Sequence, residues 1–197
     1  MGAAVIAPAS DNFIAPKGDL WVFGYGSLMW DPGFTVQSSR SALLYGYQRR
    51  FCVYSHKFRG TRKRPGLVMG LTPGGACRGT AHRIAAADVP HALEALWVRE
   101  MSRNTYFPRM VRIHFARDTH GKQRTAQALV FVADPSHYAY AGKLTPEHTA
   151  RIIAAAHGAR GANADYLHNC VIQLREAGVV DRRLEWLNER VCQLRMK

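Results

Sequence analysis

The sequence predicts an α+β protein in which a curled sheet or small antiparallel β-barrel is covered by flanking α-helices. Three observations support this fold class. Short apolar or alternating stretches, separated by glycine turns, fill most of the first two thirds of the chain. One amphipathic segment interrupts them near residues 90–101. The last third carries helical periodicity, with apolar residues recurring every three or four positions.

The stretch Trp21–Trp30 (WVFGYGSLMW) opens the predicted sheet. Residues 21–23 are aromatic or β-branched and predict a buried strand. Gly24 and Gly26 follow, and glycine lets the backbone turn sharply with no Cβ between the main chain and a ligand. Successive N–H groups in such a turn can form a nest for an anionic group. We therefore expect this turn to hold a small carboxylate-bearing substrate. The alternative is a hairpin corner where glycine only eases the bend.

Two other glycine motifs do not fit this stretch. A dinucleotide-binding fingerprint needs a third glycine and a following helix, whereas a Pro-Gly pair at 32–33 blocks that helix. A nucleophile elbow needs glycine on both sides of the serine, whereas Leu28-Met29 follows Ser27. The stretch therefore predicts neither a dinucleotide site nor an activated serine.

The remaining predicted strands have a short apolar run or an alternating pattern. They are Gln48–Tyr54, Leu67–Leu71, Ala76–Ile84, 111–115 and 125–132. Between the second and third of these, Thr72-Pro73-Gly74-Gly75 predicts a hairpin-type turn. Short strands joined by such turns favour a sheet that curls on itself.

One helix is predicted between the strand groups, from about Pro90 to Met101. Proline suits the first turn of a helix, where its missing N–H costs nothing. The apolar positions are Leu93, Leu96 and Trp97, and the next member of that series is Glu100. At about 100° per residue, Glu100 lies within some 20° of Leu93, in the middle of the apolar stripe.

Glu100 is therefore expected on the buried face, whereas its neighbour Arg99 falls outside the stripe. Burial without a full partner raises the pKa of a carboxylate, and the negative end of the helix acts in the same direction. A carboxylate in this setting is suited to proton transfer. The alternative is a structural glutamate that reaches water or pairs with Arg103 or Arg109.

Three helices are predicted in the last third. Each begins at a polar N-cap residue, and the ranges are Thr145–Gly158, Asn163–Gly178 and Asp181 onward. Their apolar stripes indicate core packing and imply no chemistry. The last helix carries apolar residues at near-heptad spacing, which are Leu184, Leu187, Val191 and Leu194. This series can support dimer contacts, so we expect a monomer or a weak dimer.

Length and composition are those of one globular domain, since the chain has 197 residues of which 47% are hydrophobic. We expect a flexible leader over residues 1–18 and a single domain over 19–197. The leader lacks the basic start and sustained apolar core of a signal peptide. No apolar run approaches the roughly 20 residues that span a bilayer, so no membrane partner is expected.

Cysteine usage favours a reducing compartment. The four cysteines form no Cys-x-x-Cys pair; they are Cys52, Cys77, Cys170 and Cys192. This argues against a zinc site or a redox motif. We therefore expect a cytoplasmic protein.

The formal charge is +13, which favours anionic partners. The densest basic cluster is Lys57, Arg59, Arg62, Lys63 and Arg64. This cluster is interpreted as a solvated loop, with a substrate-steering patch or a phosphate contact as alternatives. No nucleic-acid-binding motif accompanies it, and we do not expect nucleic acid to be the partner.

Five segments in order resemble the ChaC-like glutathione-specific gamma-glutamylcyclotransferases. They are WVFGYGSLMWDPGF (Trp21–Phe34), GYQRRFCVYS (Gly46–Ser55) with the FRGT and PGLVMGL that follow, REM with Tyr106-x-Pro108, GANADYL (Gly161–Leu167), and LREAGVVDRRL. The resemblance covers roughly residues 21–187. One departure is the run Arg62-Lys63-Arg64, which is more basic than the family pattern.

The resemblance implies a gamma-glutamylcyclotransferase-like fold with no metal or organic cofactor. It also implies a cyclotransferase of the lyase type that converts glutathione to 5-oxoproline and cysteinylglycine. The family's catalytic glutamate matches Glu100, within Arg99-Glu100-Met101. Its substrate-binding loop matches Val22, Phe23, Gly24, Tyr25, Gly26, Ser27 and Leu28.

These residue types suit that reaction. A γ-glutamyl compound carries its own nucleophile, the α-amine, which is largely protonated at neutral pH and must lose a proton to attack the γ-carbonyl. One carboxylate near both nitrogens can remove that proton and then protonate the departing amine. Backbone N–H groups of the turn can stabilise the oxyanion that develops.

Three further positions are weaker candidates. Arg59 is a possible ligand for a substrate carboxylate, and Tyr106 and Tyr166 are possible pocket residues. The tyrosines could also orient Glu100. A structural role is the alternative for all three, and it is the favoured one for Arg59. Other functions also stay open, namely cyclisation of other γ-glutamyl amines, hydrolysis by water, or nucleic-acid binding by a basic domain.

Overall fold

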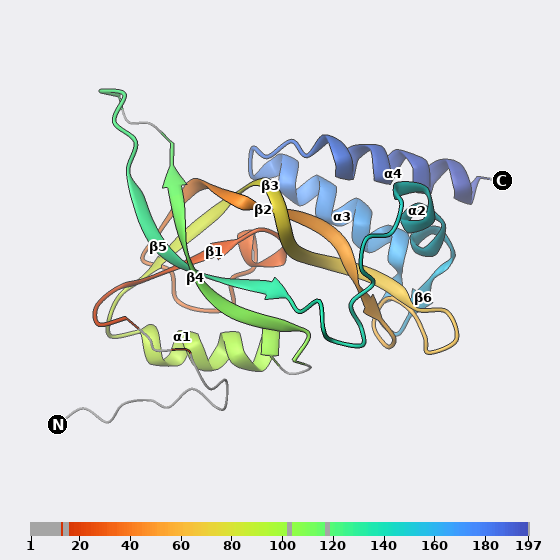
Figure 1. Ribbon diagram of the computed structural model, residues 1–197, viewed down its shortest axis with the longest axis horizontal. Helices are drawn as coiled ribbons and strands as arrows, with labels where there is room; N and C mark the ends of the chain where they lie inside the picture. The colour runs from red at the N-terminus through yellow and green to blue at the C-terminus, as the bar shows by residue number, and fades with distance from the viewer. Residues whose placement is uncertain (1–12, 14–15, 102–103, 117–118, 197) are drawn as a thin grey trace. The chain divides into compact units, whose positions relative to one another are not determined.

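The computed structural model describes residues 13, 16–101, 104–116 and 119–196 (Figure 1). These residues form two compact units that alternate along the chain. The first unit lies within residues 1–48 and 71–132, and the second within 49–70 and 133–197. Most of the predicted leader, as well as Arg103, lies outside the described residues.

Five strands form a closed barrel, in the order β1-β3-β2-β4-β5. Their bounds are β1 Leu20–Gly24, β2 Ser38–Ser55, β3 Gly66–Ile84, β4 Tyr106–Phe115 and β5 Thr125–Ala133. β1 is antiparallel to β3, with Leu20 opposite Ile84, and parallel to β5, with Val22 opposite Leu129. The barrel therefore closes through one parallel pair, and the predicted α+β barrel class is confirmed.

β3 corrects one prediction from the sequence. The hairpin-type turn expected at Thr72-Pro73-Gly74-Gly75 is absent, because β3 continues through these residues. Gly74 and Gly75 have φ angles of 111° and 69°, which glycine adopts without strain. The Gln48 side chain donates to the carbonyl oxygen of Pro73. The glycines thus allow a local distortion within one long strand, as in a β-bulge.

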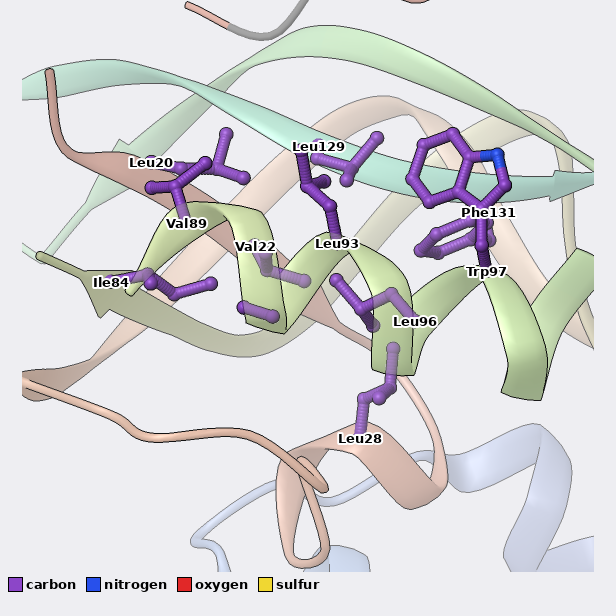
Figure 2. Close-up of a cluster of buried hydrophobic side chains, with 11 residues drawn as sticks. Leu20, Val22, Leu28, Ile84, Val89, Leu93, Leu96, Trp97, Leu129 and Phe131 are labelled. Carbon is purple, nitrogen blue, oxygen red and sulfur yellow. The ribbon is translucent and has the colours of Figure 1, made fainter. Parts of the chain in front are cut away.

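The helical segment of the first unit packs its apolar side against β1 and β5 (Figure 2). Helix α1 spans Val89–Leu96 and is followed by the π-helical turn η2, Trp97–Met101. Leu93 and Leu96 are buried with β1 and β5 side chains in one cluster. Trp97 is the last buried residue of the segment in this cluster. Its ring centroid lies 5.8 Å from that of Phe131 and 5.2 Å from that of Phe13. This packing fixes where the segment after Trp97 lies.

The second unit contains three α-helices that pack on one another (Figure 1). They are α2 Pro146–Ala155, α3 Asn163–Glu176 and α4 Arg182–Arg195. The short strands β6 His157–Gly158 and β7 Gly161–Ala162 form a hairpin between α2 and α3. The helix predicted over Thr145–Gly158 therefore ends at Ala155, because the residues that follow pair as the strands β6 and β7.

Two of the three predicted N-caps are confirmed. The Thr145 side chain accepts a hydrogen bond from the His148 N–H, and that of Asp181 accepts from two N–H groups of α4. Asn163 is not a cap. It is fully buried, and its side chain accepts from the N–H of Leu67 and donates to the carbonyl oxygen of Leu67. Its amide thus satisfies the backbone of β3 in place of the helix end.

Two cysteine thiols are deeply buried. Burial raises the pKa of Cys52 and of Cys170 to about 12. Both thiols therefore stay protonated at neutral pH and are poor nucleophiles. No helix among the described residues is long and apolar enough to cross a membrane.

Candidate active site

The turn after β1 folds tightly on itself. It passes through Tyr25 and Gly26 into the single 3₁₀ turn η1, Ser27–Met29. A Cβ placed on Gly24 would lie 2.9 Å from both the carbonyl carbon of Leu28 and the amide nitrogen of Met29. Contacts this short to backbone atoms cannot be relieved by a side-chain movement. Gly24 is therefore required because η1 returns onto the end of β1.

Several N–H groups of this turn are open. The N–H of Met29 donates to the Gly26 carbonyl oxygen at 2.8 Å, and that of Asp31 donates to Ser27 O at the same distance. By contrast, the N–H groups of Gly26, Ser27 and Leu28 find no acceptor among the described residues. Three successive N–H groups that donate to no described residue are available to bind an anionic group.

The predicted loop residues divide into two groups. Val22 and Phe23 are fully buried within the paired strand β1, and Val22 belongs to the cluster against α1 (Figure 2). Tyr25 is also buried, and its hydroxyl donates to the carbonyl oxygen of Phe131 at 2.9 Å. Ser27 is the most accessible residue of the turn. The first two residues therefore serve the core, whereas the segment from Gly24 to Leu28 presents backbone.

The sequence predicted a regular helix through Glu100, but this residue lies in the π-helical turn η2. A π-helical turn holds more residues per turn than an α-helix and is frequent at functional sites. The Glu100 side chain is only 15% exposed. Burial raises its pKa, and the Arg99 charge partly opposes that rise. The predicted buried carboxylate is therefore present.

Arg99 connects Glu100 with the turn, which the sequence did not predict. Its Nη2 donates to Oγ of Ser27 at 2.8 Å, and its Nε lies 3.3 Å from Oε1 of Glu100. Its Nη1 donates to the carbonyl oxygen of Asp31 at 2.6 Å. Arg99 is not part of the apolar cluster around α1, and its side chain is 29% exposed, as its position outside the stripe predicts. The Ser27 hydroxyl is the acceptor that links Arg99 to the turn.

The weaker candidates occupy both units. Tyr106 on β4 is half-buried and packs on the cluster around α1. In the second unit, the Arg59 guanidinium lies 5.0 Å from the ring centroid of Tyr166 and donates to the carbonyl oxygen of Arg160. These contacts give Arg59 a structural role within its own unit.

This chain is similar in sequence to a known family and to several named proteins. Residues 20–194 match the family described as ChaC-like protein. The Escherichia coli (strain K12) protein named glutathione-specific gamma-glutamylcyclotransferase is 36% identical over 165 residues, which cover 84% of this chain and 69% of that protein. The Danio rerio protein named glutathione-specific gamma-glutamylcyclotransferase 1 is 37% identical over 158 residues, which cover 79% of each.

A solved structure extends the similarity to the fold. It is the crystal structure of a gamma-glutamyl cyclotransferase specific to glutathione from yeast, with a TM-score of 0.79 and 25% sequence identity. The superposition covers 90% of this chain and 97% of the yeast chain. Because the family match spans both the barrel and the C-terminal helices, this chain belongs to the ChaC-like protein family.

Proposed function

We propose that this protein is a glutathione-specific gamma-glutamylcyclotransferase, an enzyme that converts glutathione to 5-oxoproline and cysteinylglycine. One observation carries the proposal: a buried carboxylate, Glu100, is joined through Arg99 to a turn with three open N–H groups. The reaction needs a proton-transfer group beside donors for an anionic substrate, and this arrangement supplies both. The relatives named above carry the same activity in their names.

The substrate is held by the turn. The open N–H groups of Gly26, Ser27 and Leu28 receive the α-carboxylate and the γ-carbonyl oxygen of the γ-glutamyl group. Hydrogen bonds from backbone N–H groups to a carboxylate or an oxyanion are charge-assisted and stronger than those between neutral groups. Folding the glutamyl chain so that its α-amine meets its γ-carbonyl supplies a large part of the acceleration.

Glu100 carries protons from the α-nitrogen to the departing nitrogen. As a carboxylate it accepts a proton from the α-ammonium, which frees the nitrogen lone pair to attack the γ-carbonyl carbon. A carbon–nitrogen bond forms, the carbonyl oxygen becomes an oxyanion, and turn N–H groups stabilise it. When the oxyanion collapses, the bond to the cysteine nitrogen breaks, and Glu100 gives its proton to that nitrogen. Glu100 then takes the second proton that the ring nitrogen must lose and passes it to the free amine, which leaves as an ammonium group. The products are the five-membered lactam and the free dipeptide.

The pKa of Glu100 fits both halves of this cycle. Burial raises it, which makes the carboxylate a stronger base than an exposed one. Arg99 opposes that rise, and its positive charge favours the ionised form that the first step needs. A proton-transfer group is most effective when its pKa approaches the working pH.

Mass spectrometry of the purified protein incubated with glutathione tests the proposal. We expect equal amounts of 5-oxoproline and cysteinylglycine, and no ¹⁸O in the 5-oxoproline when the reaction runs in H₂¹⁸O. Release of ¹⁸O-labelled glutamate would identify a hydrolase. If 5-oxoproline forms from γ-glutamyl-alanine and not from glutathione, the substrate is another γ-glutamyl amine. Absence of 5-oxoproline with both would refute the proposal.

Partner and compartment remain proposals of the same kind. We expect the exposed basic residues Arg62, Lys63 and Arg64 to raise the local concentration of anionic glutathione. We also expect a cytoplasmic enzyme that acts as a monomer or weak dimer.

A further inference from the structure

His82, on β3, makes a buried contact with the turn. Only 4% of the residue is exposed, and its Nε2 lies 2.8 Å from the carbonyl oxygen of Leu28. Its Nδ1 lies 2.8 Å from Oγ of Ser39. A carbonyl oxygen only accepts hydrogen bonds, so Nε2 carries the proton and donates it. In the neutral ring Nδ1 then accepts from the Ser39 hydroxyl, and the two neighbours together select one tautomer.

We infer that His82 is a positioning residue of the substrate-binding turn, acting through the Nε2–H bond to Leu28. The inference rests on the proposed function, because it concerns the N–H groups that hold the γ-glutamyl group. His82 itself does not touch the substrate or transfer a proton. It holds the peptide group that closes the turn, and so sets the direction of the open donors.

The peptide group between Leu28 and Met29 is held at both ends. His82 donates to its carbonyl oxygen, and its N–H donates to Gly26 O at 2.8 Å. Because a peptide group is planar, these two bonds leave it only a rotation about the line that joins the two atoms. The same group lies against Gly24 with no room for a Cβ. Rotation of this plane would turn the preceding N–H groups away from any ligand they share.

The hydrogen bond to Leu28 does not depend on the protonation state of His82. Burial lowers the pKa of His82, and the bond to the Leu28 carbonyl partly opposes that change. When protonated, the ring still carries a hydrogen on Nε2, so the bond persists. The neighbours described around the ring are Leu28 O, Ser39 Oγ and the Phe34 edge at 6.2 Å between centroids. None of these groups is charged.

Three variants and a control test the inference. His82→Leu removes the donor, whereas His82→Gln places an amide N–H near the position of Nε2. Ser39→Ala removes the partner of Nδ1, and because Ser39 is exposed, water can replace it. Ile84→Val, in the buried cluster that also contains Leu28, controls for general loosening of the core. The measurements are kcat and KM with glutathione, the pH profile of kcat/KM, and the amide hydrogen exchange of Met29.

We expect His82→Leu to lower kcat/KM by about 10- to 100-fold, since misplacing a catalytic geometry by about 1 Å can cost about 100-fold. Its Met29 amide should exchange faster. His82→Gln should recover kcat/KM to within about fivefold of the wild type, with an unchanged pH profile. Ser39→Ala and Ile84→Val should stay within about threefold of the wild type. These margins reflect the small net free energy of a single hydrogen bond.

Four results would overturn the inference. They are wild-type activity in His82→Leu, a loss in Ile84→Val equal to that in His82→Leu, a large loss in Ser39→Ala, and a pH profile altered in His82→Gln. The last two would indicate proton transfer through the histidine. Should the wild type form no 5-oxoproline, the proposed function fails separately. Met29 exchange then decides: acceleration in His82→Leu that His82→Gln reverses supports the positioning role, and unchanged exchange refutes it.

Discussion

The Nη2 atom of Arg99 lies 2.8 Å from Oγ of Ser27, which ties the end of η2 to the turn after β1. Through Nε, the same guanidinium contacts Glu100, and through Nη1 it contacts the Asp31 backbone. A guanidinium is planar and rigid, so one group fixes the positions of these three partners relative to one another. The carboxylate proposed to move the proton is therefore held relative to the N–H groups proposed to bind the substrate.

Replacing Glu100 with Gln should abolish turnover while the protein stays folded. Glutamine is nearly isosteric but cannot accept and return the proton. General acid–base catalysis is typically worth about 10²–10⁴-fold, and kcat should fall by at least about 100-fold. Steady-state kinetics measures the loss, and calorimetric titration with glutathione should still detect binding. A variant that keeps more than about a hundredth of wild-type kcat would exclude Glu100 as the proton carrier.

The same variant should be more stable than the wild type at neutral pH. Because burial raises the pKa of Glu100, the native state holds this proton more tightly than the unfolded chain does. The contribution of Glu100 to the free energy of unfolding is therefore fully present below the ordinary pKa of 4.5 and is lost as the pH rises through the raised value. Glu100→Gln removes that decrease. Thermal unfolding at pH 4 and pH 8 should show its advantage only at pH 8; an equal Tm difference at both values would contradict this account.

Replacing Arg99 with Met should move the acidic limb of the pH–activity profile to higher pH. The positive charge of Arg99 lowers the pKa of Glu100, so its loss lets the pKa rise further and delays ionisation. Ser27→Ala is the matched control, because it removes one contact of Arg99 but keeps the charge. Its acidic limb should stay in place. The pH dependence of kcat/KM for both variants checks this, and a limb that moves toward acid in Arg99→Met would contradict it.

Replacing Gly24 with Ala should damage both stability and activity. The new Cβ would lie 2.9 Å from backbone atoms of Leu28 and Met29, so the turn must shift. Overpacking of this kind typically costs about 1–3 kcal/mol. Gly142→Ala is the control, since Gly142 has a φ of 67° but no atom within 4 Å of the added Cβ. It should lower Tm and leave kcat intact. Equal kcat losses in the two variants would mean that the turn geometry is not the cause.

Neutralising Arg62, Lys63 and Arg64 together should weaken capture of glutathione without changing the chemical step. These side chains are exposed, so they act only through the surface potential. The loss in kcat/KM should be visible at low salt and vanish near 1 M, where the Debye length is about 3 Å. An unchanged kcat is expected. A wild-type gel shift with oligonucleotides that survives Glu100→Gln and is lost on neutralisation would favour nucleic-acid binding instead.

Local patterns predicted much of this fold because they depend on neighbours in sequence. The strand at 21–23 is apolar on both faces because Val22 packs in the cluster with α1, while Phe23, on the opposite face, is also fully buried. The stripe of Leu93, Leu96 and Trp97 indicated the face that meets β1 and β5. Thr145 and Asp181 act on N–H groups two or three residues away. The burial of Glu100 also followed from this stripe.

Features set by distant contacts could not be predicted in the same way. The partners of Arg99, which are Ser27 and Asp31, lie 72 and 68 positions away in the sequence. The bond from His82 to Leu28 joins residues 54 positions apart. At residues 72–75, a proline and two glycines suit a hairpin turn as well as a distorted strand, and only pairing decides between them. A glutamate with an adjacent arginine was the one signal in the sequence that pointed toward Arg99.

The buried amide of Asn163 has a consequence for any shortened form of the protein. It meets the N–H and the carbonyl of Leu67 as another strand would. A fragment that stops before Asn163 leaves this part of β3 as an open strand edge, which is a template for pairing with other chains. Truncation there should yield aggregates, so the C-terminal third also protects the barrel strands from self-association.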